Sequence, residues 1–267
     1  MSDQAIRFDD GAAYEEMMGV WSRLAGDIFL DWLKPDLGLR WIDVGCGNGA
    51  FTERLVERCA PAEVEGVDPS DGQLAYARGR HKAGIAHFTN AGAMELPFPA
   101  NLFDAAVMAL VIFFVPVPAK GVSEMRRVVR PGGSVSAYAW DVLDGGLPHQ
   151  NVRAGLEAIG HPIPMPPSVE ASNIDNLRRL WADAGLLNIE TRTIEVHRSY
   201  TDFEEYWRVS LMAPSISQTA KTMPPSSLAQ LRETLRSTMQ PDATGRILCS
   251  ARAVSYTHLT LPTNREV

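Results

Sequence analysis

The stretch LRWIDVGCGNG, residues 39–49, decides the fold of this chain. Residues 39–44 are mostly apolar and include β-branched side chains, which is typical of a buried strand. Gly45, Gly47 and Gly49 follow, and residues 50–59 then have the apolar spacing of a helix. A glycine turn between a strand and a helix lets a ligand approach the backbone, where the helix presents free N–H groups. We therefore expect a ligand site at this turn.

The glycine spacing alone leaves the ligand open. Dinucleotides, mononucleotides and S-adenosylmethionine all use such a turn, and Ala50 satisfies the last position of the dinucleotide fingerprint. Asp43 is more informative, because a carboxylate at the end of the strand would repel a pyrophosphate and attract an ammonium group. S-adenosylmethionine carries an ammonium and a sulfonium, so Asp43 favours it over a dinucleotide.

A second acidic residue ends the next expected strand. Asp68 follows Gly49 by 19 residues, a position that suits a carboxylate accepting hydrogen bonds from ribose hydroxyls. An Asp before a proline, here Pro69, also forms turns without any ligand. Because the glycine turn lies upstream, we favour ribose binding by Asp68.

Strand-like and helix-like segments alternate along the chain. We expect strands at residues 39–45, 63–68, 86–90, 103–109, 134–140, 189–200 and 245–254, and helices at 12–33, 50–59, 71–80, 120–129, 152–159, 173–184 and 226–239. Thr201 is expected to cap a further short helix. This alternation predicts βαβ units and an α/β, Rossmann-like, doubly wound sheet with helices on both faces.

Composition limits the possible functions. The chain has 267 residues, of which 45% are hydrophobic, and its net charge is 25 − 32 = −7. An acidic chain is a poor candidate for general nucleic-acid binding, which needs clustered cations. The longest apolar stretch, residues 105–117, is shorter than the about 20 residues that a membrane span requires. Three cysteines and no leader-like first residues favour a cytoplasmic protein without a disulfide framework.

The chain is expected to form one domain over residues 1–254. A helical cap (1–35) precedes the ligand-binding half (39–140), the Pro- and Gly-rich residues 141–172 suggest a lid, and residues 173–254 complete the sheet. Residues 255–267, SYTHLTLPTNREV, resemble translated sequencing-adapter read-through, so we expect the natural chain to diverge near Val254. An ordinary polar tail is the alternative, and no function is assigned to this segment.

Four segments in order resemble the class I S-adenosylmethionine-dependent methyltransferases, most closely the type 11, UbiE-like enzymes that act on small molecules. They are IDVGCGNGAFTE (42–53), VEGVDPS (64–70), MELPFPANLFDAAVMAL (94–110) and EMRRVVRPGGSV (124–135). The resemblance covers residues 39–140. It implies a seven-stranded sheet whose last strand is antiparallel, S-adenosyl-L-methionine as cofactor, and methyl transfer by in-line displacement.

The resemblance also implies which residues contact the cofactor. The glycines would line its methionine part, Asp43 its ammonium, Asp68 its ribose, and Pro69 its adenine. The full set is Asp43, Gly45, Cys46, Gly47, Gly49, Asp68, Pro69, Gln73, Ala93, Met94, Ala109 and Leu110, with Tyr14 and Trp21 of the first helix either covering the cofactor or packing that helix down. Gly92 stands where many members have an Asp that accepts a hydrogen bond from adenine. Adenine recognition here must then use backbone, water or another side chain.

The sequence gives fewer indications of which residues bind the methyl acceptor. Some methyl acceptors need a general base, and the candidates are Tyr138, His149 and His161, each with a simpler structural or solvent-exposed role as the alternative. An apolar acceptor pocket would draw on aromatic residues that also suit the core: Phe113, Phe114, Trp140, Phe203, Tyr206 and Trp207. The scattered histidines and unpaired cysteines indicate no metal site.

Two other functions stay open at this point. One is an NAD(P)-dependent oxidoreductase, against which Asp43 and an antiparallel seventh strand argue. The other is a non-catalytic, methyltransferase-like binding protein, which Gly92 and the lack of a clear base leave possible. We expect a small-molecule substrate, without nucleic-acid or membrane partners. The identity of the acceptor atom and the oligomeric state are not encoded in any pattern that we recognise.

Overall fold

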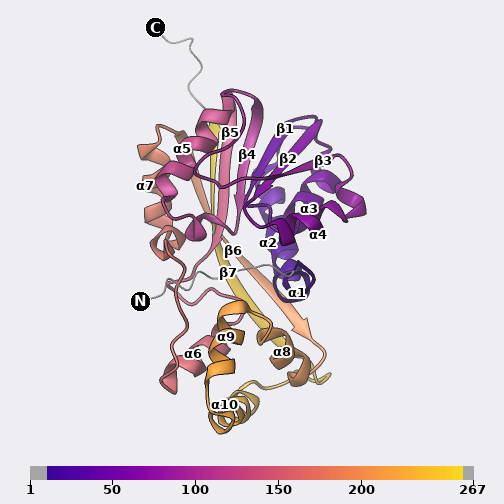
Figure 1. Cartoon of the computed structure of the whole chain (residues 1–267), viewed down its shortest axis with the longest axis vertical. Coiled ribbons are helices and arrows are strands. Elements are labelled where there is room, and N and C mark those ends of the chain that lie inside the picture. Colours follow the sequence, from indigo (N-terminus) through magenta and orange to yellow (C-terminus); the bar gives the residue numbers. More distant parts are fainter. Residues whose placement is uncertain (1–10, 261–267) are drawn as a thin grey trace.

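The computed structural model of the chain describes residues 11–260. Its centre is a seven-stranded sheet of order β3-β2-β1-β4-β5-β7-β6 (Figure 1). The strands are β1 (Arg40–Val44), β2 (Glu63–Asp68), β3 (Ala86–Asn90), β4 (Phe103–Ala109), β5 (Val129–Trp140), β6 (Leu187–Tyr200) and β7 (Ile247–Thr260). The first five are mutually parallel, and β7 lies antiparallel between β5 and β6. The expected fold class is confirmed.

Helices cover both faces of this sheet. One face carries α2 (Val20–Leu33), α3 (Ala50–Cys59) and α4 (Asp71–Arg78), and the other carries α5 (Pro118–Val128) and α7 (Ile174–Asp183) (Figure 1). The described residues begin with α1 (Gly11–Tyr14) and a π-helical turn, η1 (Glu15–Gly19), and both continue directly into α2. The expected helix 12–33 therefore exists, but with a widened turn near its start.

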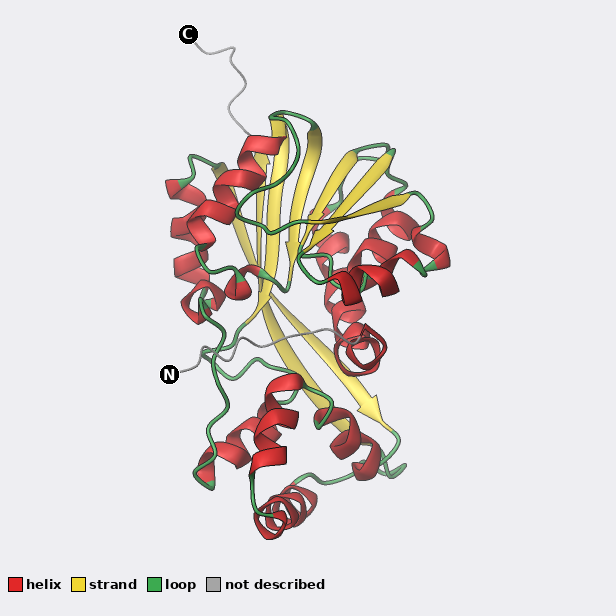
Figure 2. Cartoon of the chain, in the orientation of Figure 1, coloured by secondary structure: helices red, strands yellow, loops and turns green. Residues whose placement is uncertain are grey.

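A second group of helices lies below the sheet (Figure 2). It comprises α6 (Gln150–Ala158), α8 (Phe203–Ser210), α9 (Pro214–Thr222) and α10 (Pro225–Thr238). The β6–β7 ladder reaches this group because it continues to Tyr200–Ile247, whereas β5 stops pairing with β7 at Trp140–Ala253. We call these four helices and the adjoining strand ends the helical lobe. Short single-turn helices also occur at His81–Ala83 (η2), Ile112–Phe114 (η3) and Val169–Ser172 (η4).

Several elements differ from the sequence expectation. Helix α9 falls in a Ser-, Thr- and Pro-rich segment that shows no clear helical pattern; Pro214 opens it at a position where a missing N–H costs nothing. The cap of α8 is Asp202, whose side chain accepts a hydrogen bond from Glu205 N, so the expectation for Thr201 was wrong. Strand β7 extends to Thr260 rather than ending at Val254.

The backbone of residues 255–260 occupies an interior position of the sheet. Ser255 pairs with Tyr138 on one side and Arg192 on the other, and the ladder continues beyond it on both sides. The suspected read-through segment thus supplies strand β7 as far as Thr260, and residues 261–267 lie outside the described part. That these residues are foreign to the natural chain stays a prediction.

The described helices include none that is long and apolar enough to cross a membrane.

Candidate active site

The turn between β1 and α3 holds its three glycines in left-handed backbone conformations. Gly45, Gly47 and Gly49 have φ angles of 79°, 53° and 77°. A Cβ on Gly45 would lie 2.4 Å from Val111 Cγ1, so the segment after β4 requires a glycine here. A Cβ on Gly47 would meet no atom of the described chain within 4 Å. The turn is therefore packed on one side and open on the other, as a cradle for a ligand must be.

Asp43 lies fully buried in β1, two residues before the turn. Its Oδ2 accepts a hydrogen bond from Thr52 Oγ1 at 2.6 Å, whereas its buried Oδ1 has no partner within residues 11–260. Burial raises the pKa of Asp43 to about 7; the Thr52 hydrogen bond opposes this effect and the charge of Asp68 adds to it. An unsatisfied buried oxygen is costly. A cation or N–H donor placed at Oδ1 would remove that cost.

Asp68 ends β2 and braces the same turn. Its Oδ2 accepts a hydrogen bond from Gly47 N at 3.0 Å, and its Oδ1 accepts one from Ser70 N at 2.9 Å. Burial raises the pKa of Asp68, and these two N–H donors partly offset the rise. Each carboxylate oxygen has further acceptor capacity, so Asp68 can still receive ribose hydroxyls. Burial also raises the pKa of Cys46 well above the ordinary value, which keeps it a thiol rather than a nucleophile.

The residues expected around the nucleoside surround the neighbouring strand ends. Gln73 is buried on α4 and Pro69 is exposed, while Ala93 and Met94 are half-buried in the loop after β3. At Gly92 a Cβ would meet no described atom within 4 Å. No neighbouring side chain within the described residues fills the space that the usual Asp would occupy.

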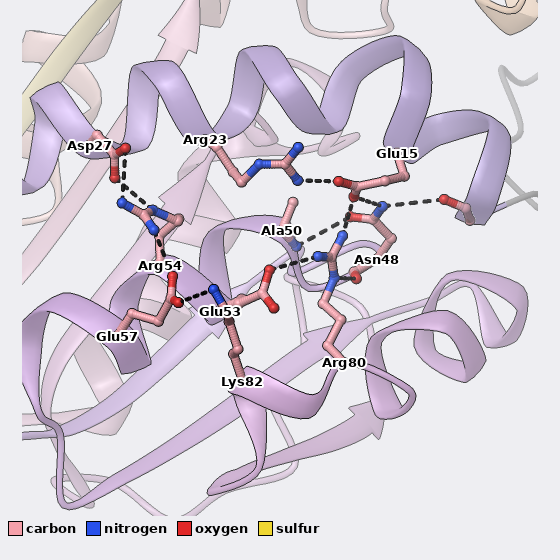
Figure 3. Close-up of polar contacts among 11 residues, drawn as sticks. Glu15, Arg23, Asp27, Asn48, Ala50, Glu53, Arg54, Glu57, Arg80 and Lys82 are labelled. Carbon is pink, nitrogen blue, oxygen red and sulfur yellow. Dashed lines mark hydrogen bonds and ion pairs between the residues drawn. The ribbon is translucent and has the colours of Figure 1, made fainter.

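A polar network fastens the first helical segment over the glycine turn (Figure 3). Glu15 of η1 accepts hydrogen bonds from Arg23, from Arg80 and, at 3.0 Å, from Asn48 Nδ2. Asn48 Nδ2 also reaches Gly11 O at 3.2 Å, and Arg80 Nε donates to Asn48 O at 2.6 Å. Burial alone would raise the pKa of Glu15, but Arg23 and Arg80 hold it below its usual value. Sequence patterns do not reveal this network, because Glu15 and Arg80 are 65 residues apart.

An apolar cavity of about 110 Å³ lies between the carboxyl ends of β4 and β5 and the helical lobe. It is lined by Tyr14, Met17, Met18, Leu110, Phe113, Phe114, Trp140, Leu147, His149, Arg153, Ile163, Pro164, Pro166, Ala213, Pro214, Ser215 and Ile216. Leu110 directly follows Ala109, the half-buried last residue of β4, and adopts a left-handed conformation with φ 63°. Such a strained residue is typical of functional sites. The cavity thus begins beside the segment that packs on Gly45.

The structure separates the aromatic candidates into two groups. Phe113, Phe114 and Trp140 line the cavity. The other three, Phe203, Tyr206 and Trp207, pack within the core and do not line it. Tyr14 lines the cavity, whereas Trp21 is fully buried in the core, where it packs the helix down.

The three candidate bases have different surroundings. Tyr138 is fully buried between Phe29 and Phe51, and its hydroxyl lies 3.5 Å from Ser22 O. Burial raises its pKa far above the ordinary value, so Tyr138 is a core residue rather than a base. His161 is half-buried and does not line the cavity.

His149 is the candidate that reaches the cavity. Its Nδ1 lies 3.1 Å from Ser210 Oγ, and its buried Nε2 has no partner within the described chain. Burial lowers the pKa of His149 to about 3, with the charge of Arg198 contributing, so the imidazole is neutral. A neutral imidazole at a cavity wall can hydrogen-bond to a ligand. Within residues 11–260, no group of three or more His, Cys, Asp or Glu side chains is placed so that it could hold a metal ion.

Comparison with known proteins agrees with this geometry. Residues 42–137 match the family model of the methyltransferase domain. Over 115 residues the chain is 36% identical to an uncharacterized methyltransferase of Mycobacterium tuberculosis, covering 43% of this chain and 45% of that protein. Over 133 residues it is 32% identical to the ubiquinone/menaquinone biosynthesis C-methyltransferase UbiE of Cereibacter sphaeroides, covering 48% and 52%. The chain spans about half the length of the curated relatives it matches.

A solved structure shows the same fold over nearly the whole chain. Phosphoethanolamine N-methyltransferase 2 of Haemonchus contortus, in complex with phosphomonomethylethanolamine and S-adenosylhomocysteine, aligns with a TM-score of 0.61 at 19% identity. The alignment covers 98% of this chain and 60% of that one. The strand order and the glycine turn agree with the family match over residues 42–137. Residues 42–137 of this chain thus resemble the methyltransferase domain family, and the solved structure, at 19% identity, shows the shared fold.

Proposed function

We propose that this protein transfers the methyl group of S-adenosylmethionine to a small, largely apolar acceptor. The observation that carries the proposal is the apolar cavity that begins at Leu110, next to the segment packed on Gly45. Small-molecule sites are concave and mostly apolar, with a few polar groups that fix orientation. The relatives named as sterol and quinone C-methyltransferases support an apolar acceptor.

The residues at the turn fit the cofactor. Asp43 Oδ1 is buried without a donor in the described chain, which suits the cofactor's ammonium. The open side of Gly47 leaves room for the methionine part, and Asp68 would hold the ribose. When bound, S-adenosylmethionine supplies a methyl group that its sulfonium already activates. The protein's own work is therefore to align the acceptor and exclude water.

The acceptor side supports positioning more than proton transfer. His149 is neutral and its Nε2 can accept or donate a hydrogen bond, but its lowered pKa makes it a weak base. We therefore assign His149 to holding the acceptor rather than to deprotonating it. The buried free thiols Cys46, Cys59 and Cys249 support a reducing compartment such as the cytoplasm as the place of action.

Calorimetry with three ligands tests the cofactor. S-adenosylmethionine and S-adenosylhomocysteine should bind, and NAD should not. Binding of NAD alone would overturn the proposal in favour of an oxidoreductase. Binding of S-adenosylhomocysteine without turnover on any apolar acceptor would favour the non-catalytic alternative.

Asp68→Ala should weaken the binding of S-adenosylhomocysteine by at least about 1 kcal/mol, because charge-assisted hydrogen bonds are lost. The change also removes the acceptor of Gly47 N. Asp71→Ala is a matched control, since this carboxylate is exposed on α4 and contacts Asn90. Calorimetry on both variants measures the effect. An Asp68→Ala affinity equal to that of the control would remove Asp68 from the site.

A further inference from the structure

The cavity is lined by one cationic side chain, by one neutral histidine and by no acidic residue of the described chain. Arg153 and His149 line it, and no Asp or Glu of the described chain does. Most of the remaining wall is apolar, including Phe113 and Trp140. In such surroundings a charge is poorly solvated, so the charge of Arg153 acts strongly on anything that enters the cavity.

The guanidinium of Arg153 uses one of its three nitrogen atoms in contacts with the described chain. Its Nη2 donates to Ile163 O at 2.9 Å and contacts Met165 Sδ at 2.7 Å. Its Nη1 and Nε have no acceptor within residues 11–260, and the acidic group that influences it is Glu157, exposed one turn further along α6. A half-buried guanidinium without a carboxylate partner is costly to maintain. A ligand that brings a carboxylate into the cavity would supply the missing acceptor, in the bidentate geometry that guanidinium favours.

His149 adds a second polar group on the same side. It precedes α6 and lies four residues before Arg153, a spacing that places two side chains on one helix face. Its Nδ1 is engaged by Ser210 at 3.1 Å, which leaves the buried Nε2 as the free end of the ring. Nearby Arg198, whose Nη1 donates to the carbonyls of Glu16 and Met17, adds further positive charge.

We propose that the methyl acceptor is an apolar, ring-sized carboxylic acid whose carboxylate is bound by Arg153. This inference rests on the proposed function, because it takes the cavity to be the acceptor site. Arg153 would be the residue that selects acids over neutral molecules of the same shape. The aromatic and aliphatic wall would hold the ring system.

A pair of matched probes tests this selection. Isothermal titration of 2-naphthoate and of the neutral 2-naphthamide into the protein saturated with S-adenosylhomocysteine gives both affinities. We expect naphthoate to bind at least about tenfold more tightly than naphthamide, since a charge-assisted hydrogen bond contributes on this scale. In Arg153→Met the preference should disappear while naphthamide affinity changes less than about threefold. Equal affinities in the unmodified protein, or no binding of naphthoate, would overturn the inference.

Two variants guard against a misfolded or generally altered protein. Arg179→Met removes an exposed arginine that lies outside this cavity, on α7, and should keep the naphthoate preference. Arg153→Lys keeps the positive charge and should retain part of the preference for naphthoate. If Arg153→Met binds neither probe, Arg153→Lys becomes the deciding variant. Equal affinities of Arg153→Lys for naphthoate and naphthamide would then overturn the inference. Titration of S-adenosylhomocysteine alone separates the two proposals. Its failure to bind refutes the proposed function, whereas cofactor binding without acid preference refutes only the role of Arg153.

Discussion

At the scale of single residues, the ligand-binding properties that we propose for the glycine turn depend on the buried carboxyl group of Asp43 as much as on the glycines. Asp43 has no solvent exposure, and the hydroxyl of Thr52 satisfies one of its two oxygens. Its pKa of about 7 means that burial favours the neutral acid over the carboxylate. The protein thereby stores an unfavourable interaction that a cationic ligand group would relieve.

Asp43→Asn should stabilise the ligand-free protein at high pH and weaken its binding of S-adenosylhomocysteine. The folded-state pKa of about 7 exceeds the usual 3.8. The native state therefore binds the proton more tightly, and the contribution of Asp43 to stability falls as the pH rises from about 4 to about 7. Asn mimics the neutral acid, so the stability of the variant relative to the unmodified protein should rise by about 3 kcal/mol between pH 4.5 and pH 8.

Urea unfolding at the two pH values measures this gain, and calorimetry measures the binding. Asp68 also has a raised pKa, so the part of its pH dependence that comes from its own burial is common to both proteins, whereas its interaction with the Asp43 charge is lost in the variant. In the unmodified protein, affinity for S-adenosylhomocysteine should rise between pH 6 and pH 8, and this rise should be smaller in Asp43→Asn. A variant that is equally destabilised at both pH values would contradict this account.

At the scale of secondary-structure elements, the π-helical turn aims the first helix at the glycine turn. A Cβ on Gly19 would lie 2.5 Å from Glu15 Oε2, so glycine allows the Glu15 carboxylate to lie against the backbone of its own helix. From there Glu15 meets Arg80, whose side chain is only 8% exposed and also pairs with Glu53 at 2.8 Å. A widened turn of this kind is frequent at functional sites. Here it closes one side of the cofactor turn.

Arg80→Met should loosen this closure. Removing Arg80 leaves the carboxylates of Glu15 and Glu53 without this cationic partner. We therefore expect a loss of about 2–4 kcal/mol in the free energy of unfolding. Arg58→Met is the control, because Arg58 pairs with Asp27 and Asp31 at the surface and should cost less than about 1 kcal/mol. Urea unfolding gives both values. Hydrogen exchange should accelerate at residues 11–19 in Arg80→Met alone; unchanged protection there would refute the closing role.

At the scale of the whole molecule, two insertions form the helical lobe. Helix α6 lies between β5 and α7 in the chain, whereas α8, α9 and α10 lie between β6 and β7. The two insertions meet where α10 packs on α6, with Leu231 against Gly155. The β6–β7 ladder connects the lobe to the sheet. The apolar cavity is lined by residues of both insertions, whereas the glycine turn contains residues of neither.

Gly155→Val should disturb the lobe and spare the cofactor turn. A Cβ at this position would lie 2.5 Å from Leu231 Cδ1, and the two methyl groups of Val add to the crowding, so Leu231 must leave its position against α6, at a cost of about 1–3 kcal/mol. Hydrogen exchange should rise in α6 and α10, while affinity for S-adenosylhomocysteine should change less than about threefold. Ala154→Val places the same side chain on the exposed side of α6 and serves as control. A tenfold loss of cofactor affinity in Gly155→Val alone would show that the two parts are coupled.

Sequence patterns located the sheet and three of the four lobe helices; the bounds of α6 and α10 lie within two residues of the expectation, whereas α9 was missed. The bounds of β2, β3, β4 and α3 agree with the expectation, because turn residues flank each of them and because β4 and α3 also have a clear apolar pattern. Helix α9 has no such pattern and forms where the lobe offers Ile216 a buried place. The expected site divides in the same way. Asp43, Asp68 and the glycines converge as expected, whereas Trp21 and Tyr138 pack into the core.

The sequence by itself determined the fold class and the position of the cofactor turn, because strand periodicity and glycine spacing are local properties of the chain. The placement of acidic residues at two strand ends also follows locally, since parallel strands bring those ends together. Only the tertiary structure brought Arg80 to Glu15, left Asp43 Oδ1 without a donor, and set Arg153 and His149 in an apolar wall. These features depend on burial and on contacts between distant segments, which no local pattern encodes.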